Sequence, residues 1–148
     1  MFSRFEDKIL VNKNKKLLLL NWIKDNSGKQ LYPQRKITSI YYDNSILQTY
    51  HDSNEGIVPR KKIRIRYYNE KKNELFIEKK INSAEGRYKF VNKAKERKIR
   101  VITDNMYGIC LPKIKVQYIR NYFRVLNKRI TIDNQITYLS LKNDFKIR

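Results

Sequence analysis

One stretch of nine residues, Arg60–Tyr68, limits the fold more than any other part of this chain. It reads R-K-K-I-R-I-R-Y-Y, so that two sets alternate: Arg60, Lys62, Arg64 and Arg66 with Lys61, Ile63, Ile65 and Tyr67. A β-strand sends successive side chains to opposite faces, so one face carries four cations and the other mostly apolar or aromatic groups. Isoleucine and tyrosine also favour strands. The pattern predicts an amphipathic strand whose charged face, taken alone, is usually solvated.

The composition predicts one folded domain with an anionic partner. The chain has 148 residues, of which 41% are hydrophobic, and this favours a single domain over residues 1–148. The formal net charge is +20. The positive charges repel one another and destabilise a compact state, which favours a polyanionic partner: nucleic acid, an anionic membrane or a phosphate-rich ligand.

Cysteine and histidine usage excludes several kinds of site. Cys110 is the only cysteine and His51 the only histidine, which excludes an intrachain disulfide, a thiolate metal cluster and a site with two histidines. We expect His51 at the surface and Cys110 as a small buried residue. The apolar run Leu17–Leu20 is too short to span a membrane, and the N-terminus lacks the layout of a signal peptide. The expectation is therefore a soluble cytoplasmic domain.

The other segments predict short strands joined by turns. Besides Arg60–Tyr68, strands are expected at Ser3–Val11, Ile37–Tyr42, Ile46–His51, Glu74–Ile81, Arg87–Val91, Ile114–Arg124, Arg129–Asp133, Ile136–Leu141 and Phe145–Ile147. The leucine spacing of Lys15–Lys24 predicts a short helix. A hairpin turn is expected at Asp43–Ser45, a loop at Asp52–Gly56, and a basic helix or loop at Ala94–Arg100. These elements predict a mainly β (α+β) fold, an antiparallel barrel or sandwich with one or two short helices.

Several predicted strands repeat the alternation of charged and apolar side chains. The charged or polar sets are Arg4, Glu6 and Lys8; Arg60, Lys62, Arg64 and Arg66; Glu78 and Lys80; and Arg129, Thr131 and Asp133. In a barrel, one alternating set faces the interior. An interior of arginine and lysine suits a linear phosphate chain, because guanidinium binds phosphate oxygens in bidentate fashion and lysine adds a mobile charge. Carboxylates there would hold a divalent ion that bridges phosphates.

The same segments resemble the VTC (vacuolar transporter chaperone) domain, of the triphosphate-tunnel and CYTH-like group. The resemblance rests on R-F-E-D-K at Arg4–Lys8, S-I-Y-Y-D at Ser39–Asp43, R-K-K-I-R-I-R-Y-Y at Arg60–Tyr68, F-I-E-K-K at Phe76–Lys80, Y-I-R-N-Y-F at Tyr118–Phe123 and R-I-T-I-D at Arg129–Asp133. They occur in the family's order over most of the chain. The resemblance implies a tunnel-shaped antiparallel β-barrel that binds ATP and polyphosphate. Its members include polyphosphate polymerases, which transfer the terminal phosphoryl group of ATP to a growing chain with Mn²⁺ or Mg²⁺.

The resemblance also implies candidate site residues. The phosphate-binding candidates are Lys8, Arg60, Lys62, Arg64, Arg66, Lys80, Lys89, Arg120 and Arg129, of which Arg60 and Lys62 follow from the alternation and Lys89 is a weaker motif match. The catalytic candidates are Lys8, Arg64 and Arg66. Glu6 and Glu78 are candidate ligands for the metal ion, and each is at least as well suited to balance neighbouring cations.

Two differences from the family keep other functions open. The segment between Lys89 and Pro112 is shorter than expected, and the chain ends before a late strand that supplies a carboxylate and a lysine in the family. A phosphate-binding module without turnover is therefore an alternative. A tunnel hydrolase is disfavoured, because those relatives carry a glutamate where this chain has Arg4. A general nucleic-acid-binding protein is a third hypothesis, based on the charge and eleven tyrosines, but no recognised nucleic-acid motif is present. A membrane segment is not expected, and a membrane partner is left open.

Overall fold

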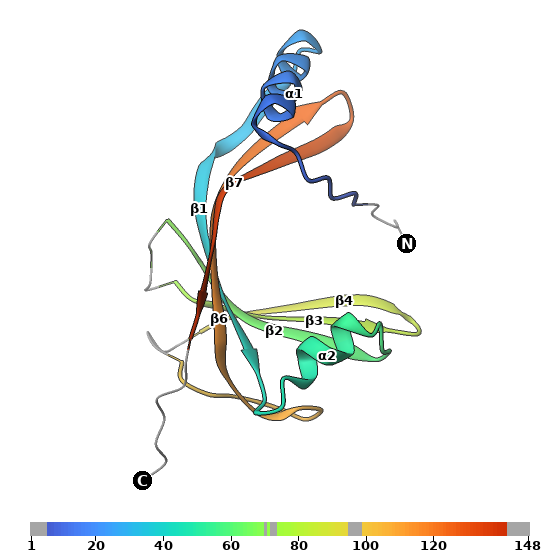
Figure 1. Ribbon diagram of the computed structural model, residues 1–148, viewed down its shortest axis with the longest axis vertical. Helices are drawn as coiled ribbons and strands as arrows, with labels where there is room; N and C mark the ends of the chain where they lie inside the picture. Colours follow the sequence, from blue (N-terminus) through green and yellow to red (C-terminus); the bar gives the residue numbers. More distant parts are fainter. Residues whose placement is uncertain (1–5, 70, 72–73, 95–98, 142–148) are drawn as a thin grey trace. The chain divides into compact units, whose positions relative to one another are not determined.

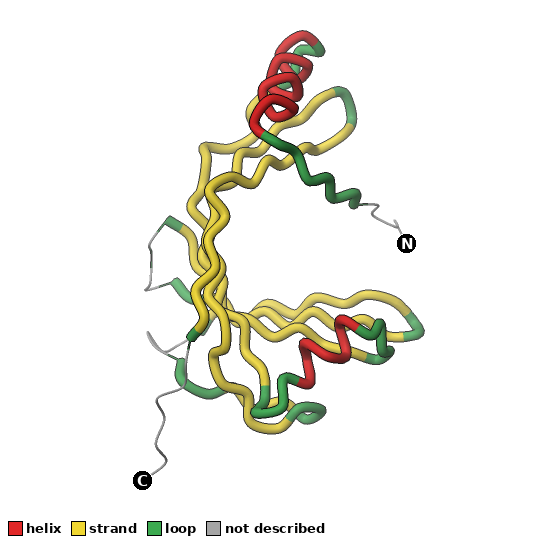
Figure 2. Tube along the Cα trace, in the orientation of Figure 1, coloured by secondary structure: helices red, strands yellow, loops and turns green. Residues whose placement is uncertain are grey.

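The computed structural model describes residues 6–69, 71, 74–94 and 99–141. The elements of this part are α1 (Lys13–Asp25), β1 (Lys29–Asp43), α2 (Gln48–Asn54), β2 (Arg60–Tyr68), β3 (Phe76–Ser83), β4 (Gly86–Lys93), β5 (Ile102–Asp104), β6 (Gly108–Val125) and β7 (Lys128–Ser140) (Figure 1). The strands form one sheet in the order β4-β3-β2-β1-β6-β5, and β7 pairs with β6. The predicted mainly β, antiparallel fold with one or two short helices is confirmed, and the described residues contain two, α1 and α2 (Figure 2). Over the described residues the sheet is not closed into a barrel.

The chain divides into two compact units. Residues 1–33 and 121–132 form one, called here the helix–hairpin unit, and residues 34–120 and 133–148 form the other, the sheet unit. Three strands, β1, β6 and β7, contribute residues to both units.

The helix–hairpin unit is built around α1. The side chain of Asn12 accepts a hydrogen bond from the amide of Lys15 (2.8 Å) and caps the start of the helix. Ile23 is buried against Val125 and Ile132 of the β6–β7 hairpin. A Cβ atom at Gly28 would overlap the side chain and carbonyl of Ile23, so the chain leaves the helix at a position where only glycine fits. The helix expected at Lys15–Lys24 is confirmed.

The sheet unit has its hydrophobic core on one face of β2. Ile63, Ile65 and Tyr67 alternate along this strand and are 1%, 2% and 6% exposed. The core contains Tyr42, Ile63, Ile65, Tyr67, Leu75, Ile102, Tyr107 and Cys110. The strand expected at Arg60–Tyr68 is confirmed over its full length, and so is the division of its two faces. Cys110 is buried and His51 is exposed, as expected.

Two predicted strands are wrong. In residues 6–11, the described part of Ser3–Val11, the backbone is irregular. Ile9 and Leu10 are 80% and 97% exposed, so the apolar side chains of this segment do not pack against a sheet. Ile46–His51 is not a strand, because Gln48–Asn54 forms α2.

The carboxylate of Asp43 stabilises the start of α2 and explains why a helix forms there instead of a strand. It accepts hydrogen bonds from the amides of Thr49 (2.9 Å) and Tyr50 (3.0 Å). These amides lie in the first turn of α2, where they have no partner within the helix. Asp43–Ser45 therefore leads into a helix and not into a hairpin, and the loop expected at Asp52–Gly56 begins within α2.

The C-terminal half joins segments that were predicted separately. Arg129–Asp133 and Ile136–Leu141 belong to one strand, β7, apart from Leu141, which follows its end. Its residue Gln135 has φ 51°, so the strand continues across a local irregularity. The strand expected at Phe145–Ile147 lies outside the described residues, as do residues 95–98 of the expected basic segment.

Candidate functional site

One face of the sheet unit collects cations from β2, β3 and β4. Residues directly opposite each other in antiparallel strands share a face. Lys62 lies opposite Lys80, which lies opposite Lys89, so three cations form one row across the strands. The surface called here the basic face consists of Arg60, Lys62, Arg64, Arg66, Lys80, Arg87, Lys89 and Lys93.

Arg64 is held in place by two partners on the basic face. Its Nε donates a hydrogen bond to Oε2 of Glu78 (2.7 Å), and its Nη2 lies 2.6 Å from the same oxygen. Its Nη1 donates to the hydroxyl of Tyr41 (3.0 Å). Burial lowers the pKa of Arg64, but Tyr41 and Glu78 outweigh it and raise the pKa above its ordinary value. Arg64 is therefore a fixed and permanently charged group.

Arg66 is held by hydroxyl groups. Its Nε donates to Oγ of Ser39 (3.0 Å), and its Nη2 donates to the hydroxyl of Tyr118 (3.4 Å). Arg66 is 9% exposed, and its Nη1 lies 3.9 Å from Oε2 of Glu78. Two neutral hydroxyls thus accept from two of its five N–H groups without adding negative charge.

Glu78 is the shared counter-charge of these groups. It is 2% exposed, and its second oxygen, Oε1, accepts a hydrogen bond from Nζ of Lys89 (2.9 Å). Burial raises the pKa of Glu78, but the hydrogen bond from Lys89 and the charge of Arg64 outweigh it, so the net pKa is lowered. Arg64, Arg66 and Lys89 thus share one ionised carboxylate, and the cluster keeps an excess of positive charge that attracts an anion.

Arg120 extends this group along β6. It binds Asp133 in bidentate fashion, with Nε–Oδ1 and Nη2–Oδ2 distances of 2.6 Å and 2.7 Å. Its guanidinium also lies 5.1 Å from the ring centre of Tyr118, whose hydroxyl accepts from Arg66. Tyr118 therefore connects the two arginines, and Asp133 fixes Arg120.

The structure brings most of the predicted phosphate-binding residues together, but not all of them. Arg60, Lys62, Arg64, Arg66, Lys80 and Lys89 lie on the basic face, and Arg120 lies beside Tyr118. Lys8 and Arg129 are exposed residues of the helix–hairpin unit. Their roles in phosphate binding stay predictions.

Sequence analysis did not assign the hydroxyl partners or the outer cations of the face. In the sequence, Ser39 and Tyr41 are only part of a family motif, and neither Arg87 nor Lys93 belongs to one of the alternating charged sets described above. The alternation within Ile37–Tyr42 groups Ser39 with Tyr41, but only the strand register places them opposite Arg66 and Arg64.

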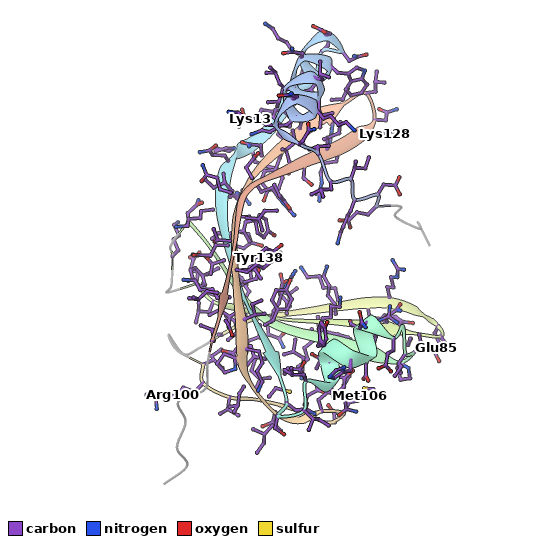
Figure 3. All side chains as sticks on the ribbon, in the orientation of Figure 1. Lys13, Glu85, Arg100, Met106, Lys128 and Tyr138 are labelled. Atoms are coloured by element: carbon purple, nitrogen blue, oxygen red, sulfur yellow. The ribbon has the colours of Figure 1, made fainter. Side chains whose placement is uncertain are left out.

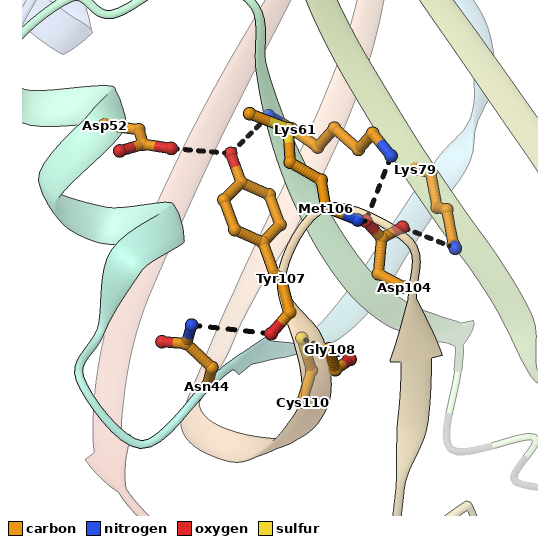
Figure 4. Close-up of polar contacts among 9 residues, drawn as sticks. All are labelled: Asn44, Asp52, Lys61, Lys79, Asp104, Met106, Tyr107, Gly108 and Cys110. Atoms are coloured by element: carbon orange, nitrogen blue, oxygen red, sulfur yellow. Dashed lines mark hydrogen bonds and ion pairs between the residues drawn. The ribbon is translucent and has the colours of Figure 1, made fainter.

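A second ionic cluster lies on the opposite, hydrophobic face of the sheet unit (Figure 4). Asp104 of β5 accepts hydrogen bonds from Nζ of Lys61 (3.0 Å), Nζ of Lys79 (2.7 Å) and the amide of Met106 (3.0 Å). Burial raises the pKa of Asp104, but these hydrogen bonds outweigh it and lower the pKa to about 2. The cluster ties β5 to β2 and β3 from behind the basic face.

Tyr107 adds a second tie between the same segment and β2. Its hydroxyl donates to Oδ2 of Asp52 in α2 (2.9 Å) and accepts from the amide of Lys61 (3.1 Å). Burial, together with the charge of Asp52, raises the pKa of Tyr107 to about 12, although the amide of Lys61 opposes this. The neutral phenol thus stays a donor at physiological pH.

The roles of Glu6 and Glu78 as metal ligands stay predictions. Glu6 is an exposed residue of the helix–hairpin unit, and both oxygens of Glu78 already accept from cations. The described part of the chain has no group of three histidine, cysteine, aspartate or glutamate side chains that could hold an ion.

No helix within the described ranges has both the length and the apolar character needed to cross a membrane.

Comparison with known proteins gives one family. The family model of the VTC domain matches residues 3–109, which is more than half of the chain. The match includes β2, β3 and β4 and therefore the whole basic face, whereas Arg120 and Arg129 lie beyond it. No curated protein matches the chain significantly. The chain belongs to the VTC domain family.

Proposed function

We propose that this chain is a polyphosphate polymerase-type domain. In this proposal the basic face binds the phosphates of ATP and of a polyphosphate chain, and the terminal phosphoryl group of ATP passes to the polyphosphate. The observation that carries the proposal is the cluster of Arg64, Arg66 and Lys89 around the single carboxylate of Glu78. Membership of the VTC domain family is consistent with a polyphosphate-related function.

The geometry suits phosphoryl transfer, because this reaction depends on positioning and on neutralising charge. In the transition state negative charge is spread over the oxygens of the transferred group. Donors that are fixed beforehand stabilise this charge without reorganising. Arg64 and Arg66 are buried and held by hydrogen bonds, so they are such donors. The side chain of Lys89 is 46% exposed, so it can leave Glu78 and follow a moving phosphate.

The role of a divalent ion stays a prediction. Both oxygens of the Glu78 carboxylate are engaged by cations, so Glu78 as described does not fit a resident Mn²⁺ or Mg²⁺, and no step is assigned to one. Mg²⁺ is commonly held by substrate phosphates with one or two carboxylates. Each assay therefore compares Mn²⁺, Mg²⁺ and a chelator. The cytoplasmic location also stays a prediction.

The decisive experiment measures polymer formation and ADP release together, with the purified chain, ATP and a short polyphosphate primer. We expect polymer with matching ADP. In the variant Arg64→Ala/Arg66→Ala we expect loss of turnover and a fall of more than about a hundredfold in tripolyphosphate affinity, because each charge-assisted hydrogen bond contributes about 1.5–3 kcal/mol.

A charge-matched control separates the site from the net charge. Arg100 and Arg124 are exposed and lie outside the basic face, so Arg100→Ala/Arg124→Ala removes the same charge elsewhere. We expect the control to keep both turnover and affinity. Equal loss in the two double variants would contradict the proposal, because it would show a dependence on total charge alone.

A binding module without turnover is the second candidate function. The arrangement of Glu78 favours it, because the cations for binding phosphate are in place while the carboxylate is occupied. Tight binding of tripolyphosphate without polymer or ADP would select this function. If the chain binds nucleic acid and short polyphosphate cannot displace it, the result would instead indicate a general nucleic-acid-binding protein.

A further inference from the structure

Strand β4 (Gly86–Lys93) forms one edge of the sheet (Figure 1). It follows the turn that contains Glu85 and pairs with β3 on one side (Figure 3). On its other side, the described residues supply no strand. All residues of β4 after Gly86 are exposed. A row of backbone donors and acceptors therefore faces away from the sheet, and such a row is a template for another strand.

The pairing with β3 determines which backbone groups of β4 face this edge. The amide of Ala94 donates to the carbonyl of Leu75 (2.7 Å). Along an antiparallel strand, residues that bond to the neighbouring strand alternate with residues that do not. The N–H and C=O groups of the even-numbered residues of β4 therefore face β3. Those of the odd-numbered residues, such as Lys89 and Val91, face away from the sheet.

The side chains of β4 give the edge a cationic side and an aromatic side. Arg87, Lys89 and Lys93 belong to the basic face. On the opposite face, Tyr88 and Phe90 are 42% and 55% exposed. The sequence of β4 contains no carboxylate. Since neighbouring side chains on one face interact across strands, a matching strand would carry acidic residues on one face and apolar residues on the other.

The cations of β4 select against a second copy of the same strand. If two copies paired through this edge, the cations of one would lie among the cations of the other, and like charges opposite each other destabilise a strand pair. Lysine on an edge strand commonly prevents such pairing between copies. A strand with acidic side chains would replace this repulsion by attraction.

We propose that β4 binds an extended peptide segment in which acidic and apolar residues alternate, and that this segment adds a strand to the sheet. Its backbone bonds to the odd-numbered residues of β4, which supplies affinity, and its side chains supply specificity. The acidic residues pair with Arg87 and Lys93, and the apolar residues cover Tyr88 and Phe90. The backbone groups of this edge take no part in the phosphate site proposed above, so the inference does not depend on that function.

The first test compares two short peptides by calorimetry with the full chain. In one peptide glutamate alternates with valine, and in the other the same residues are arranged in two blocks. Both have the same charge, so a chain that binds them only as polyanions binds them equally, and this result would overturn the inference. We expect the alternating peptide to bind at least about tenfold more tightly, because only this peptide can place its valines on the aromatic side while its glutamates face the cations.

The second test changes the backbone of the peptide and keeps its side chains. Residues that bond to each other in an antiparallel pair lie directly opposite and share a face. N-methylation of the glutamate amides should therefore abolish binding, whereas N-methylation of the valine amides, which point to solvent, should leave it intact. Equal effects of the two methylated peptides would contradict strand addition.

Amide hydrogen exchange locates the bound peptide. In the chain alone, the amides of Lys89 and Val91 should exchange rapidly, and the peptide should slow them. The amide of Phe90, which faces β3, should change little. If Lys89 and Val91 already exchange slowly without peptide, another part of the chain covers this edge and the inference is overturned.

Two variants test the edge from the side of the protein. Val91→Pro removes one outward N–H at a position where an edge strand tolerates proline, and we expect the peptide affinity to fall about three- to tenfold. Phe90→Ala removes an apolar contact and should lower it about two- to fivefold. Tyr138→Ala is the matched control, since Tyr138 is a 69% exposed aromatic residue of another strand, β7 (Figure 3). Unchanged affinity in both Val91→Pro and Phe90→Ala would show that the peptide binds elsewhere.

Discussion

Replacing Glu78 with glutamine removes the negative charge that Arg64, Arg66 and Lys89 share, and it keeps the size of the side chain. A hydrogen bond to a charged group contributes about 1.5–3 kcal/mol, which applies to the buried contact with Arg64. The contact with Lys89 is half exposed, and such an ion pair adds less than about 1 kcal/mol. We expect Glu78→Gln to lower the free energy of unfolding by about 3 kcal/mol.

The same substitution should strengthen phosphate binding. The carboxylate competes with an incoming anion for the same donors, so its removal leaves three cations without a counter-charge. We expect tripolyphosphate to bind about tenfold more tightly, because one unit charge in a partly buried site contributes at least about 1 kcal/mol. Tripolyphosphate should therefore restore more stability to the variant than to the unsubstituted chain.

Urea unfolding with and without tripolyphosphate, together with calorimetry, measures both effects. Glu74→Gln is the control, since the Glu74 side chain is 52% exposed and lies 4.0 Å from Lys93; we expect a change below about 0.5 kcal/mol. Weaker binding by Glu78→Gln would refute the competition argument and show that the carboxylate positions Arg64. Loss of a Mn²⁺ effect on binding would instead make Glu78 a metal ligand.

Two further predictions concern the ties behind the basic face. Asp104→Asn should lower the free energy of unfolding by about 2 kcal/mol at pH 7, because the pKa of Asp104 falls from 3.8 to about 2 on folding. This contribution is present above pH 4 and is lost as the pH falls toward 2, so urea unfolding at pH 7 and pH 3 should show a smaller difference at the lower pH. Tyr107→Phe should cost about 1–3 kcal/mol, because it leaves the carboxylate of Asp52 and the amide of Lys61 without this partner. Thermal unfolding that is unchanged in Tyr107→Phe would show that this tie contributes nothing.

Strand β2 could be predicted in full because its two faces differ in chemistry along most of its length. The irregular segment at residues 6–11 has a similar alternation, but alternation only states which side chains would share a face and not whether a partner strand exists. Helix α2 was missed for a different reason. Its first amides donate to Asp43 at the end of β1. This tertiary contact stabilises a helix in a segment whose residues by themselves favour a strand.

The candidate site was predictable in its cations but not in its contacts. Arg64 and Arg66 follow from the alternation, whereas their partners Ser39 and Tyr41 depend on the register between β1 and β2. Glu78 was proposed both as a metal ligand and as a charge partner. Local sequence cannot separate these roles, because both require a carboxylate among cations.

The middle of β2 is buried on both faces, and this has a consequence for how the chain reaches its native state. A slip of one position against β3 would turn Arg64 and Arg66 into the hydrophobic core and bring Ile63 and Ile65 toward Glu78. Each misplaced guanidinium would lose its partner in a nonpolar environment, at a cost of several kcal/mol. Misaligned hairpins are therefore unstable from the outset. The same arginines that are proposed to bind phosphate thus also disfavour the shifted register of β2 and β3 during folding.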